Sequence, residues 1–401
     1  MWWLDGTQCS GLLIPTVFPC GFMEHLVTNF RLNTGDEIPA VGLGTWKIAP
    51  EDADVAVSAA LEAGYRHFDC APKYNNEPEI GRALEDGMAR MGIDRKDLFI
   101  TSKLWPTEFS PPDVLPALQR TLQDLRLSYL DLFLLHIPVQ MAKPWHSPPQ
   151  REDRVLTWQV AATWQQMEAA VEQGLVRAIG VSNWSVTRLK QLLSWRPVHV
   201  PAVNQVEAHP HWRQDALLAF CKEKGIHVSV SGGTRLHTEI SVMPALPSCF
   251  HQAYAPLGSR DRPVFDESLM PPVLLDHPLI KEVANTLHQT PAQVALRWGI
   301  QRGMSVLPKS SNPWHIKENI GLFDWCIPPM DFHALSLIEP QVRILDYYGY
   351  WVGEGRPFLE PEELWNDEAD KAGEGHKVDE GDEIAFNKKG GGRNGNDEWE
   401  E

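Results

Sequence analysis

Four polar side chains that could take part in acid–base chemistry each stand at or just beyond the end of a short apolar segment. They are Asp69, Tyr74, Lys103 and His136. Each segment has the apolar, β-branched and aromatic content that is typical of a buried strand. One titratable group at the end of several successive strands is typical of the active site of a (β/α)8 barrel.

The chemistry of this set is coherent. The phenol of Tyr74 could protonate a carbonyl oxygen, but the ordinary phenol pKa of about 10 makes it a reluctant donor near neutral pH. A nearby ammonium such as Lys103 would favour the phenolate and lower that pKa. Asp69 could hold the ammonium, and His136 could orient a carbonyl by hydrogen bonding. Taken singly, each residue has an ordinary structural explanation, such as a loop aspartate or a core histidine.

Segments with strand and helix patterns alternate along the chain, which predicts a parallel α/β fold. A β-hairpin is expected over residues 29–39. Eight barrel strands are expected at 41–46, 66–70, 99–105, 130–136, 176–182, 202–207, from 226, and at 306–309. Helices are expected at 51–63, 78–90, from 111, and at 156–174, 185–194, 215–224, 278–288 and 291–302. The predicted fold class is therefore α/β, a (β/α)8 TIM barrel with an N-terminal β-hairpin.

The local sequences around the four residues resemble those of the aldo-keto reductase family. The aspartate and tyrosine stand five residues apart, the lysine lies in Thr-Ser-Lys-Leu-Trp, and the histidine lies in Leu-Leu-His-Ile-Pro. The resemblance covers roughly residues 27–340 and is strongest to the plant aldose-reductase-like branch, through residues 29–35, 74–77 and 362–365. It implies that Tyr74 is the general acid, that Lys103 and Asp69 tune it, and that His136 orients the substrate.

The same resemblance implies a nicotinamide cofactor. Ser182, Asn183 and Gln205 match the residues that hold the carboxamide, and Tyr254 matches the tyrosine that stacks on the ring. Further cofactor contacts are expected from Thr45, Trp46, Pro256, Leu257 and Ser259. No strand is followed by Gly-x-Gly-x-x-Gly, so the cofactor is expected across the C-terminal mouth of the barrel rather than on a Rossmann fold.

Residues 306–319 resemble the family segment that grips the adenosine 2′-phosphate. Lys309 and Ser310 fit the phosphate, and Glu318 and Asn319 fit the adenine. His315 stands where the family usually has an arginine, which would give a permanent, bidentate contact to phosphate. NADPH is therefore the expected cofactor, and NADH stays open as the alternative.

The substrate is expected to be a small carbonyl compound, and the pocket walls are expected to include Trp46, Trp105 and Ile137. Apolar walls with a few convergent polar groups are the usual design of a small-ligand site. Ile137 stands where many family members carry tryptophan, which predicts a wider pocket. Simple core packing is the alternative explanation for each tryptophan.

Residues 230–252 interrupt the family pattern within the seventh strand. The pattern would run from Gly225 through Ser229 directly into Ala253, so the strand is expected to consist of 226–229 and 253–257. One hypothesis is an intron translated in frame, since Val codons begin with GT and Gln252 can be encoded by CAG. The other is a genuine specificity loop. Transcripts that always retain this segment would refute the intron hypothesis.

Composition limits the other possibilities. The formal net charge of −17 argues against a nucleic-acid partner. No apolar stretch approaches the ~20 residues of a membrane span, so no membrane association is expected. Six cysteines without Cys-x-x-Cys spacing indicate neither a metal site nor a disulfide framework, and they favour the cytoplasm. A monomer is expected.

Three regions are predicted. Residues 1–22 look foreign to the rest of the chain, and Met23 could be the natural start. A secretory signal is disfavoured there because no Lys or Arg precedes the apolar stretch. Residues 23–365 form the barrel, with 230–252 as an aberrant insertion. Residues 366–401 are rich in Gly, Asp, Glu, Lys and Asn, which predicts an acidic disordered tail.

Two functional classes remain compatible with the sequence. The first is an NADPH-dependent reductase of aldehydes or ketones, with aldoses among the candidate substrates. The second is a non-catalytic, nicotinamide-nucleotide-binding regulatory protein on the same barrel. The intact set of four polar residues favours the enzyme, and the interrupted strand favours the regulatory protein.

Overall fold

The computed structural model describes residues 27–145, 153–156, 158–233, 257, 273–344, 352, 357–358 and 364–365. Several sequence predictions lie outside this part of the chain. These are the extension 1–22, the tail 366–401, the insertion from residue 234 onward, and the cofactor contacts Tyr254, Pro256 and Ser259.

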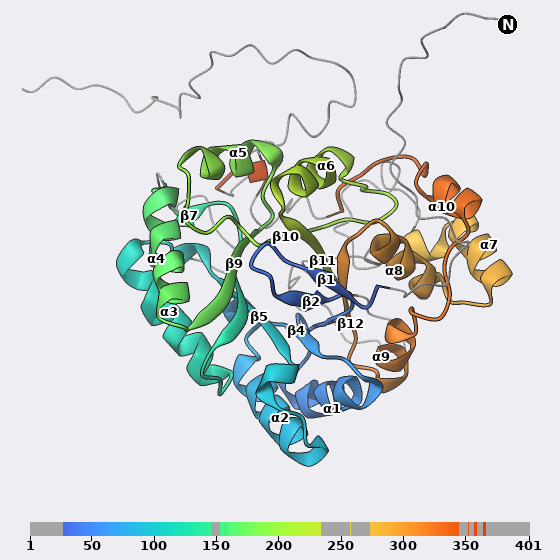
Figure 1. Cartoon of the computed structure of the whole chain (residues 1–401), viewed down its shortest axis with the longest axis horizontal. Helices are drawn as coiled ribbons and strands as arrows, with labels where there is room; N and C mark the ends of the chain where they lie inside the picture. Colours follow the sequence, from blue (N-terminus) through green and yellow to red (C-terminus); the bar gives the residue numbers. More distant parts are fainter. Residues whose placement is uncertain are drawn as a thin grey trace, which may run out of the picture.

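Eight parallel strands form one sheet that curves into a barrel (Figure 1). In sheet order they are β12 (Ser305–Lys309), β11 (His227–Gly233), β10 (Val203–Val206), β9 (Val176–Ser182), β6 (Leu130–Leu135), β5 (Phe99–Leu104), β4 (His67–Asp69) and β3 (Leu43–Gly44). A parallel bridge between Val41 and Val306 joins the first strand to the last. Its two hydrogen bonds run from the Gly42 N–H to the Val306 carbonyl and from the Val306 N–H to the Ala40 carbonyl, both at 2.9 Å. The predicted (β/α)8 fold is confirmed.

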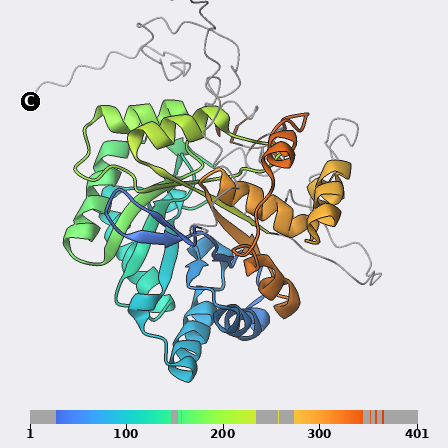
Figure 2. The ribbon, with the colours of Figure 1, turned by 45° about the vertical axis from the view of Figure 1, so that its right-hand side comes forward.

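Helices surround the barrel in both views (Figures 1 and 2). They are α1 (Ala53–Ala63), α2 (Glu77–Met91), α3 (Pro111–Asp124), α4 (Val160–Glu172), α5 (Val186–Ser194), α6 (Asp215–Lys224), α7 (Pro278–Leu287), α8 (Pro291–Gln301), α9 (Pro313–Ile320) and α10 (Pro329–Leu335). Helix α8 begins with a reciprocal capping box between Thr290 and Gln293, which satisfies two backbone donors of its first turn. The predicted start of this helix at residue 291 is thus confirmed.

One helix begins later than predicted. The sequence pattern placed the start of α4 near Leu156, but Val155–Leu156 forms β8, which pairs antiparallel with β7 (Gln140–Met141). Over so short a run, the pattern of apolar residues is compatible with a strand or a helix. Here pairing with β7 makes the segment a strand. The pairing brings Gln140–Met141, which follow β6, next to Val155–Leu156.

The N-terminal hairpin, β1 (Asn29–Arg31) with β2 (Glu37–Pro39), closes one end of the barrel. Leu32 and Ile38 are buried against inward-facing residues of the strands, including Leu132 and Leu134. The Asn33 amide donates to the Pro201 carbonyl, 3.0 Å away, at the point where β10 begins. The hairpin therefore lies at the N-terminal ends of the strands and leaves the C-terminal mouth for other groups.

The seventh strand differs from the sequence prediction. β11 runs without a break to Gly233, and Val230, Ser231, Gly232 and Gly233 pair in register with Val306 to Lys309 of β12. The prediction that the strand leaves the sheet after Ser229 is wrong, because the first four inserted residues complete it. Ladder hydrogen bonds come from the backbone, so a weak strand sequence can be held by its pairing with β12. The Ser229 and Ser305 hydroxyls, 2.6 Å apart, lie in this paired region.

Candidate active site

The four candidate residues converge at the C-terminal mouth of the barrel. Asp69 is the last residue of β4, Lys103 is the second-last of β5, and His136 directly follows β6. Tyr74 ends the short 3-10 helix η2 (Pro72–Tyr74) that follows β4. Because β4, β5 and β6 are adjacent and parallel, their carboxyl ends meet at one edge. The sequence prediction that these side chains gather is confirmed, while their roles stay predictions.

The Lys103 ammonium links the set. Its Nζ atom donates to Asp69 Oδ1 at 2.7 Å, to the Cys70 carbonyl at 3.0 Å and to the Tyr74 hydroxyl oxygen at 3.0 Å. Lys103 and Asp69 are each 1% exposed. Desolvating two charges is costly unless the geometry is good and the remaining donors are satisfied. Here the three acceptors match the three ammonium protons, so every hydrogen-bond donor of the lysine in this buried pair has a partner.

His136 is buried beside this network. Its ring lies nearly perpendicular to that of Tyr74, with centroids 5.8 Å apart, and to that of Trp105, 5.2 Å apart. Burial holds the pKa of His136 well below its ordinary value, and the positive charges of Lys103 and Lys73 act in the same direction. The imidazole is therefore neutral near pH 7, with one N–H to donate and one nitrogen to accept.

A second layer of hydrogen bonds lies next to Asp69 and His136. Gln205 Nε2 donates to Asp69 Oδ1 at 2.8 Å, and Ser182 Oγ donates to the Gln205 carbonyl at 2.9 Å. Asn183 Nδ2 donates to the His136 carbonyl at 2.9 Å. Thr45 Oγ1 donates to the Asp69 carbonyl at 2.9 Å, which anchors the end of β4. The structure thus places these four predicted cofactor residues around the same edge of the mouth.

One buried atom, Gln205 Oε1, indicates whether the predicted residues fit a nicotinamide carboxamide. Gln205 is 1% exposed, and its Oε1 atom has no hydrogen-bond partner among the described residues. A buried polar atom normally has a partner. A primary carboxamide offers N–H donors and a carbonyl acceptor, so Gln205 with Ser182 and Asn183 fits the nicotinamide group in donor and acceptor type.

The predicted phosphate segment is arranged around the start of α9. Lys309 and Ser310 are buried at the end of β12. Asn312 caps α9, its Oδ1 accepting from the Trp314 N–H at 2.9 Å. A cationic side chain and a hydroxyl at a helix N-terminus fit an anion such as a phosphate. His315 is half-buried on the first turns of the helix.

The predicted adenine residues lie further along α9. Asn319 is buried. Glu318 accepts a hydrogen bond from Thr290 Oγ1 at 2.8 Å, which ties α9 to the cap of α8. Leu257, another predicted contact, is buried in a turn. Glu318 therefore has a structural role, through its hydrogen bond to Thr290, besides the predicted cofactor contact.

The predicted pocket walls belong to one apolar cluster at the mouth. Trp105 and Ile137 are buried in it, and Trp46 is partly buried against it. The cluster also contains C-terminal residues that pack over the mouth, namely Val352, Leu364 and Trp365. Trp145 contributes from the loop after β7, with its ring centroid 5.5 Å from that of Trp105.

Sequence reasoning missed two residues of this wall, Trp145 and Lys73. The Lys73 ammonium lies 4.2 Å from the ring centroid of Trp145 and 5.3 Å from that of Trp105. The available signal for Lys73 was its position directly before the candidate acid, Tyr74. For Trp145 the local sequence offered no signal, because the fold of the loop brings it to the wall.

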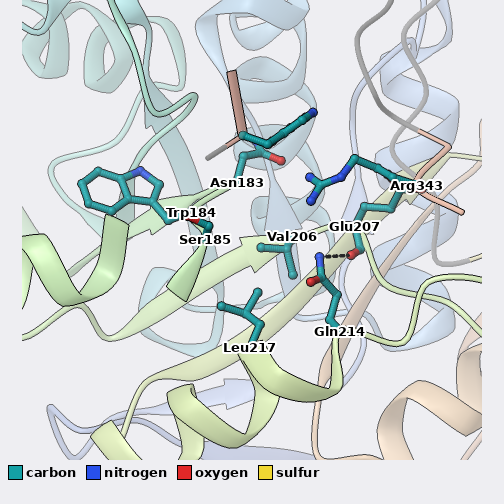
Figure 3. A pocket seen from close by; sticks show the side chains of 9 residues that line it. Asn183, Trp184, Ser185, Val206, Glu207, Gln214, Leu217 and Arg343 are labelled. Carbon is teal, nitrogen blue, oxygen red and sulfur yellow. Dashed lines mark hydrogen bonds between the residues drawn. The ribbon is translucent and has the colours of Figure 1, made fainter. Parts of the chain in front are cut away.

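A narrow crevice lies behind Asn183 (Figure 3). Arg343 points into it from the C-terminal segment, and its guanidinium also stacks on Trp365, 4.1 Å from the ring centroid. Gln214 donates to the Glu207 carbonyl at 3.1 Å on the opposite wall. The crevice marks where the C-terminal segment joins the barrel next to the predicted carboxamide site.

Membrane spans and metal clusters are both missing from the described residues. No helix in the part of the chain that the structure describes is long and apolar enough to cross a membrane. No group of three or more His, Cys, Asp or Glu side chains among the described residues could hold a metal ion.

Comparisons with known proteins agree with this architecture. Residues 40–339 match the family model described as "Aldo/keto reductase family". The chain is 42% identical to aldo-keto reductase family 4 member C11 of Arabidopsis thaliana over 339 residues, which cover 84% of this chain and 98% of that protein. It is 40% identical to human aldo-keto reductase family 1 member A1 over 318 residues, covering 78% and 90%. The solved aldose reductase of Schistosoma japonicum superposes with a TM-score of 0.67 at 35% identity, covering 83% of this chain and 99% of that one. The chain belongs to the aldo-keto reductase family.

Proposed function

We propose that this protein reduces aldehydes and ketones to alcohols with NADPH, and that Tyr74 is the general acid. Membership of the family supports carbonyl reduction with a nicotinamide cofactor in general, and the preference for NADPH and the role of Tyr74 are proposed here. The observation that carries the proposal is the Lys103 ammonium, which bridges Asp69 Oδ1 at 2.7 Å and the Tyr74 hydroxyl at 3.0 Å.

Tyr74 would donate its proton to the carbonyl oxygen of the substrate. The phenolate that remains carries a full negative charge, which the adjacent Lys103 ammonium would stabilise. Asp69 accepts from the ammonium and orients it within a buried site. Tyr74 itself is half-buried, so its hydroxyl can reach a ligand at the mouth.

His136 would position the carbonyl oxygen rather than protonate it. Because burial and two neighbouring ammonium groups hold its pKa well below the ordinary value, its imidazolium form is scarce at neutral pH. A neutral imidazole can still donate a hydrogen bond to the carbonyl oxygen. This division of roles leaves Tyr74 as the proton donor.

A bound reduced nicotinamide supplies the hydride that the carbonyl carbon receives. Ser182, Asn183 and Gln205 would hold its carboxamide, which fixes the face of the ring toward the substrate. Lys309 and Ser310 would bind the 2′-phosphate of NADPH at the start of α9. His315 offers a weaker contact than arginine, since an imidazole lacks the permanent charge and the bidentate fork of a guanidinium.

The proposal is tested by mixing the purified chain with NADPH and an aromatic aldehyde and following the absorbance of the reduced nicotinamide. Steady turnover that requires the aldehyde is the expected result. Cofactor binding without turnover of any aldehyde or ketone would contradict it.

A non-catalytic nucleotide-binding regulatory protein is the second candidate. One observation favours it: β11 reaches the mouth with Ser231, Gly232 and Gly233, where the family pattern places residues 254–256. A chain with an altered cofactor side could bind the nucleotide without efficient catalysis. The same assay separates the two candidates.

A further inference from the structure

Lys73 brings a second cationic side chain to the mouth, and the mechanism above does not use it. It is the middle residue of η2, between β4 and Tyr74. Its Nζ atom lies 4.2 Å from the ring centroid of Trp145 and 5.3 Å from that of Trp105. The Trp105 ring in turn lies 5.2 Å from the His136 ring, centroid to centroid. The ammonium therefore stands in the wall that a substrate would follow away from His136.

We propose that Lys73 is a specificity-determining residue that favours carbonyl substrates carrying a carboxylate at a distance from the reacting carbonyl. This inference rests on the proposed function, because it assigns the substrate class of the same site. The carbonyl oxygen would lie between Tyr74 and His136, and the rest of the substrate would extend along Trp105 and Trp145 to the ammonium.

The other ammonium of the site cannot serve this purpose. Lys103 is 1% exposed and already donates to Asp69, Cys70 and Tyr74. These three acceptors use all three of its protons. A substrate carboxylate that met this buried network would also approach the charge of Asp69. Lys73 is half-buried and held over aromatic faces, so it presents its charge to a ligand without disrupting the catalytic group.

The environment of Lys73 strengthens its attraction for an anion. Partial burial lowers the pKa of Lys73 to about 8, so most of the side chain remains protonated at pH 7. Its charge is felt at the site, because it helps to hold the pKa of His136 down. Charges interact more strongly where water is partly excluded. A carboxylate beside Lys73 would gain this attraction, which a neutral substrate cannot.

The test compares two matched aldehydes, para-carboxybenzaldehyde and the neutral para-formylbenzamide. The wild-type chain should show the higher kcat/KM for the carboxylate. Lys73→Met should lower kcat/KM for the carboxylate about tenfold, the lower end of the range for hydrogen bonds to charged groups. The loss should fall mainly on KM, with the neutral aldehyde changed less than about twofold on the same scale. Lys73→Arg, which keeps the charge, should retain the preference.

Lys222→Met is the matched control, because it removes one positive charge from an exposed position in the last turn of α6. That turn leads into the start of β11, at the opposite end of the barrel from the mouth. Equal losses for both aldehydes in Lys73→Met, no carboxylate preference in the wild type, or an equal loss of preference in Lys222→Met would overturn the proposal.

A chain that reduces neither of these aldehydes, nor any other aldehyde or ketone, would refute the proposed function while still testing Lys73. The affinity for para-carboxybenzaldehyde would then be read from quenching of tryptophan fluorescence. Affinity that falls with Lys73→Met and persists with Lys73→Arg would support the carboxylate subsite. Equal affinity in all three forms would refute it.

Discussion

The two sides of the barrel mouth are built differently. On the side of β4, β5 and β6, hydrogen bonds from the Lys103 ammonium join Asp69 to Tyr74. On the side of β11, the strand ends in Ser231, Gly232 and Gly233, paired to β12 through the backbone. The comparison teaches that the proton-transfer groups and the end of β11 depend on separate strands, so one can change while the other stays intact.

Tyr74→Phe should remove proton transfer on the first side and leave cofactor binding on the second side unchanged. The change removes the phenol oxygen that accepts from Lys103 Nζ at 3.0 Å and would donate the proton. General acid catalysis typically contributes 10²–10⁴-fold, so kcat for aldehyde reduction should fall by about that factor. NADPH affinity, measured by fluorescence titration, should change little. Near wild-type turnover would show that Tyr74 is not the acid.

Glu77→Gln should show how tightly the first side is packed. Glu77 begins α2, is 2% exposed, and accepts from the Ser102 hydroxyl at 2.6 Å, next to Lys103 on β5. Burial raises the pKa of Glu77 to about 8, whereas an unfolded glutamate titrates near 4.3. Between these pH values the folded chain binds the extra proton. The free energy of unfolding therefore falls as pH rises through this range.

Glutamine keeps the acceptor for Ser102 and cannot ionise, so Glu77→Gln should remove this pH dependence. At about 1.4 kcal/mol per pKa unit, the variant should gain on the order of 3–5 kcal/mol over wild type at pH 8 and little near pH 4. Denaturant unfolding at several pH values measures the effect. Glu79→Gln, on the same helix and half-buried, is the control. Parallel pH profiles for wild type and Glu77→Gln would contradict the argument.

His315→Arg should sharpen the second side. Only NADPH carries the 2′-phosphate, and arginine would add a permanent charge beside Lys309 and Ser310. A charge-assisted contact is worth about 1.5–3 kcal/mol, so NADPH should bind roughly tenfold or more tightly while NADH changes little. His315→Gln is the uncharged control. Equal improvement for both cofactors would mean that position 315 does not face the phosphate.

The grouping of the residues on the first side of the mouth could be predicted from the sequence. Strand ends can be found from apolar runs, and parallel strands bring their carboxyl ends together, so the residue order alone was enough to group Asp69, Lys103 and His136. The neutral state of His136 could not be predicted. It depends on burial and on two ammonium groups from other elements, and both are tertiary properties.

The second side and the loops were harder. The end of β11 was misplaced because the family pattern joins Ser229 directly to Ala253, while the pairing of Val230–Gly233 with β12 is a tertiary effect. Trp145 was missed because β7 and β8 pair and fold the loop over Trp105. Whether residues 230–252 are a retained intron or a real loop stays a hypothesis, because backbone pairing with β12 does not depend on how the paired residues are encoded.

Two deletions of equal length test which residues form the end of the seventh strand. Removal of 230–252 joins Ser229 to Ala253, so residues 253–256 would replace Val230–Gly233 opposite β12, with Tyr254 opposite Leu307. Removal of 234–256 deletes the same number of residues but keeps Val230–Gly233 and lacks Tyr254. Both forms shorten the chain that follows β11, and closing a longer loop costs more entropy, so both should unfold at a higher temperature than wild type.

The two deletions should differ in cofactor affinity. If Tyr254 stacks on the nicotinamide, the form without 230–252 should bind NADPH several-fold more tightly than the form without 234–256, because an aromatic stack is worth about 0.5–1.5 kcal/mol. Isothermal titration of the two forms measures this difference at equal chain length, so general effects of shortening cancel. Tyr254→Leu in the first form should abolish the advantage. Equal affinities would mean that the strand-seven side does not depend on an aromatic residue at this register. A first form that is less stable than wild type would mean that Val230–Gly233 is the native end of β11.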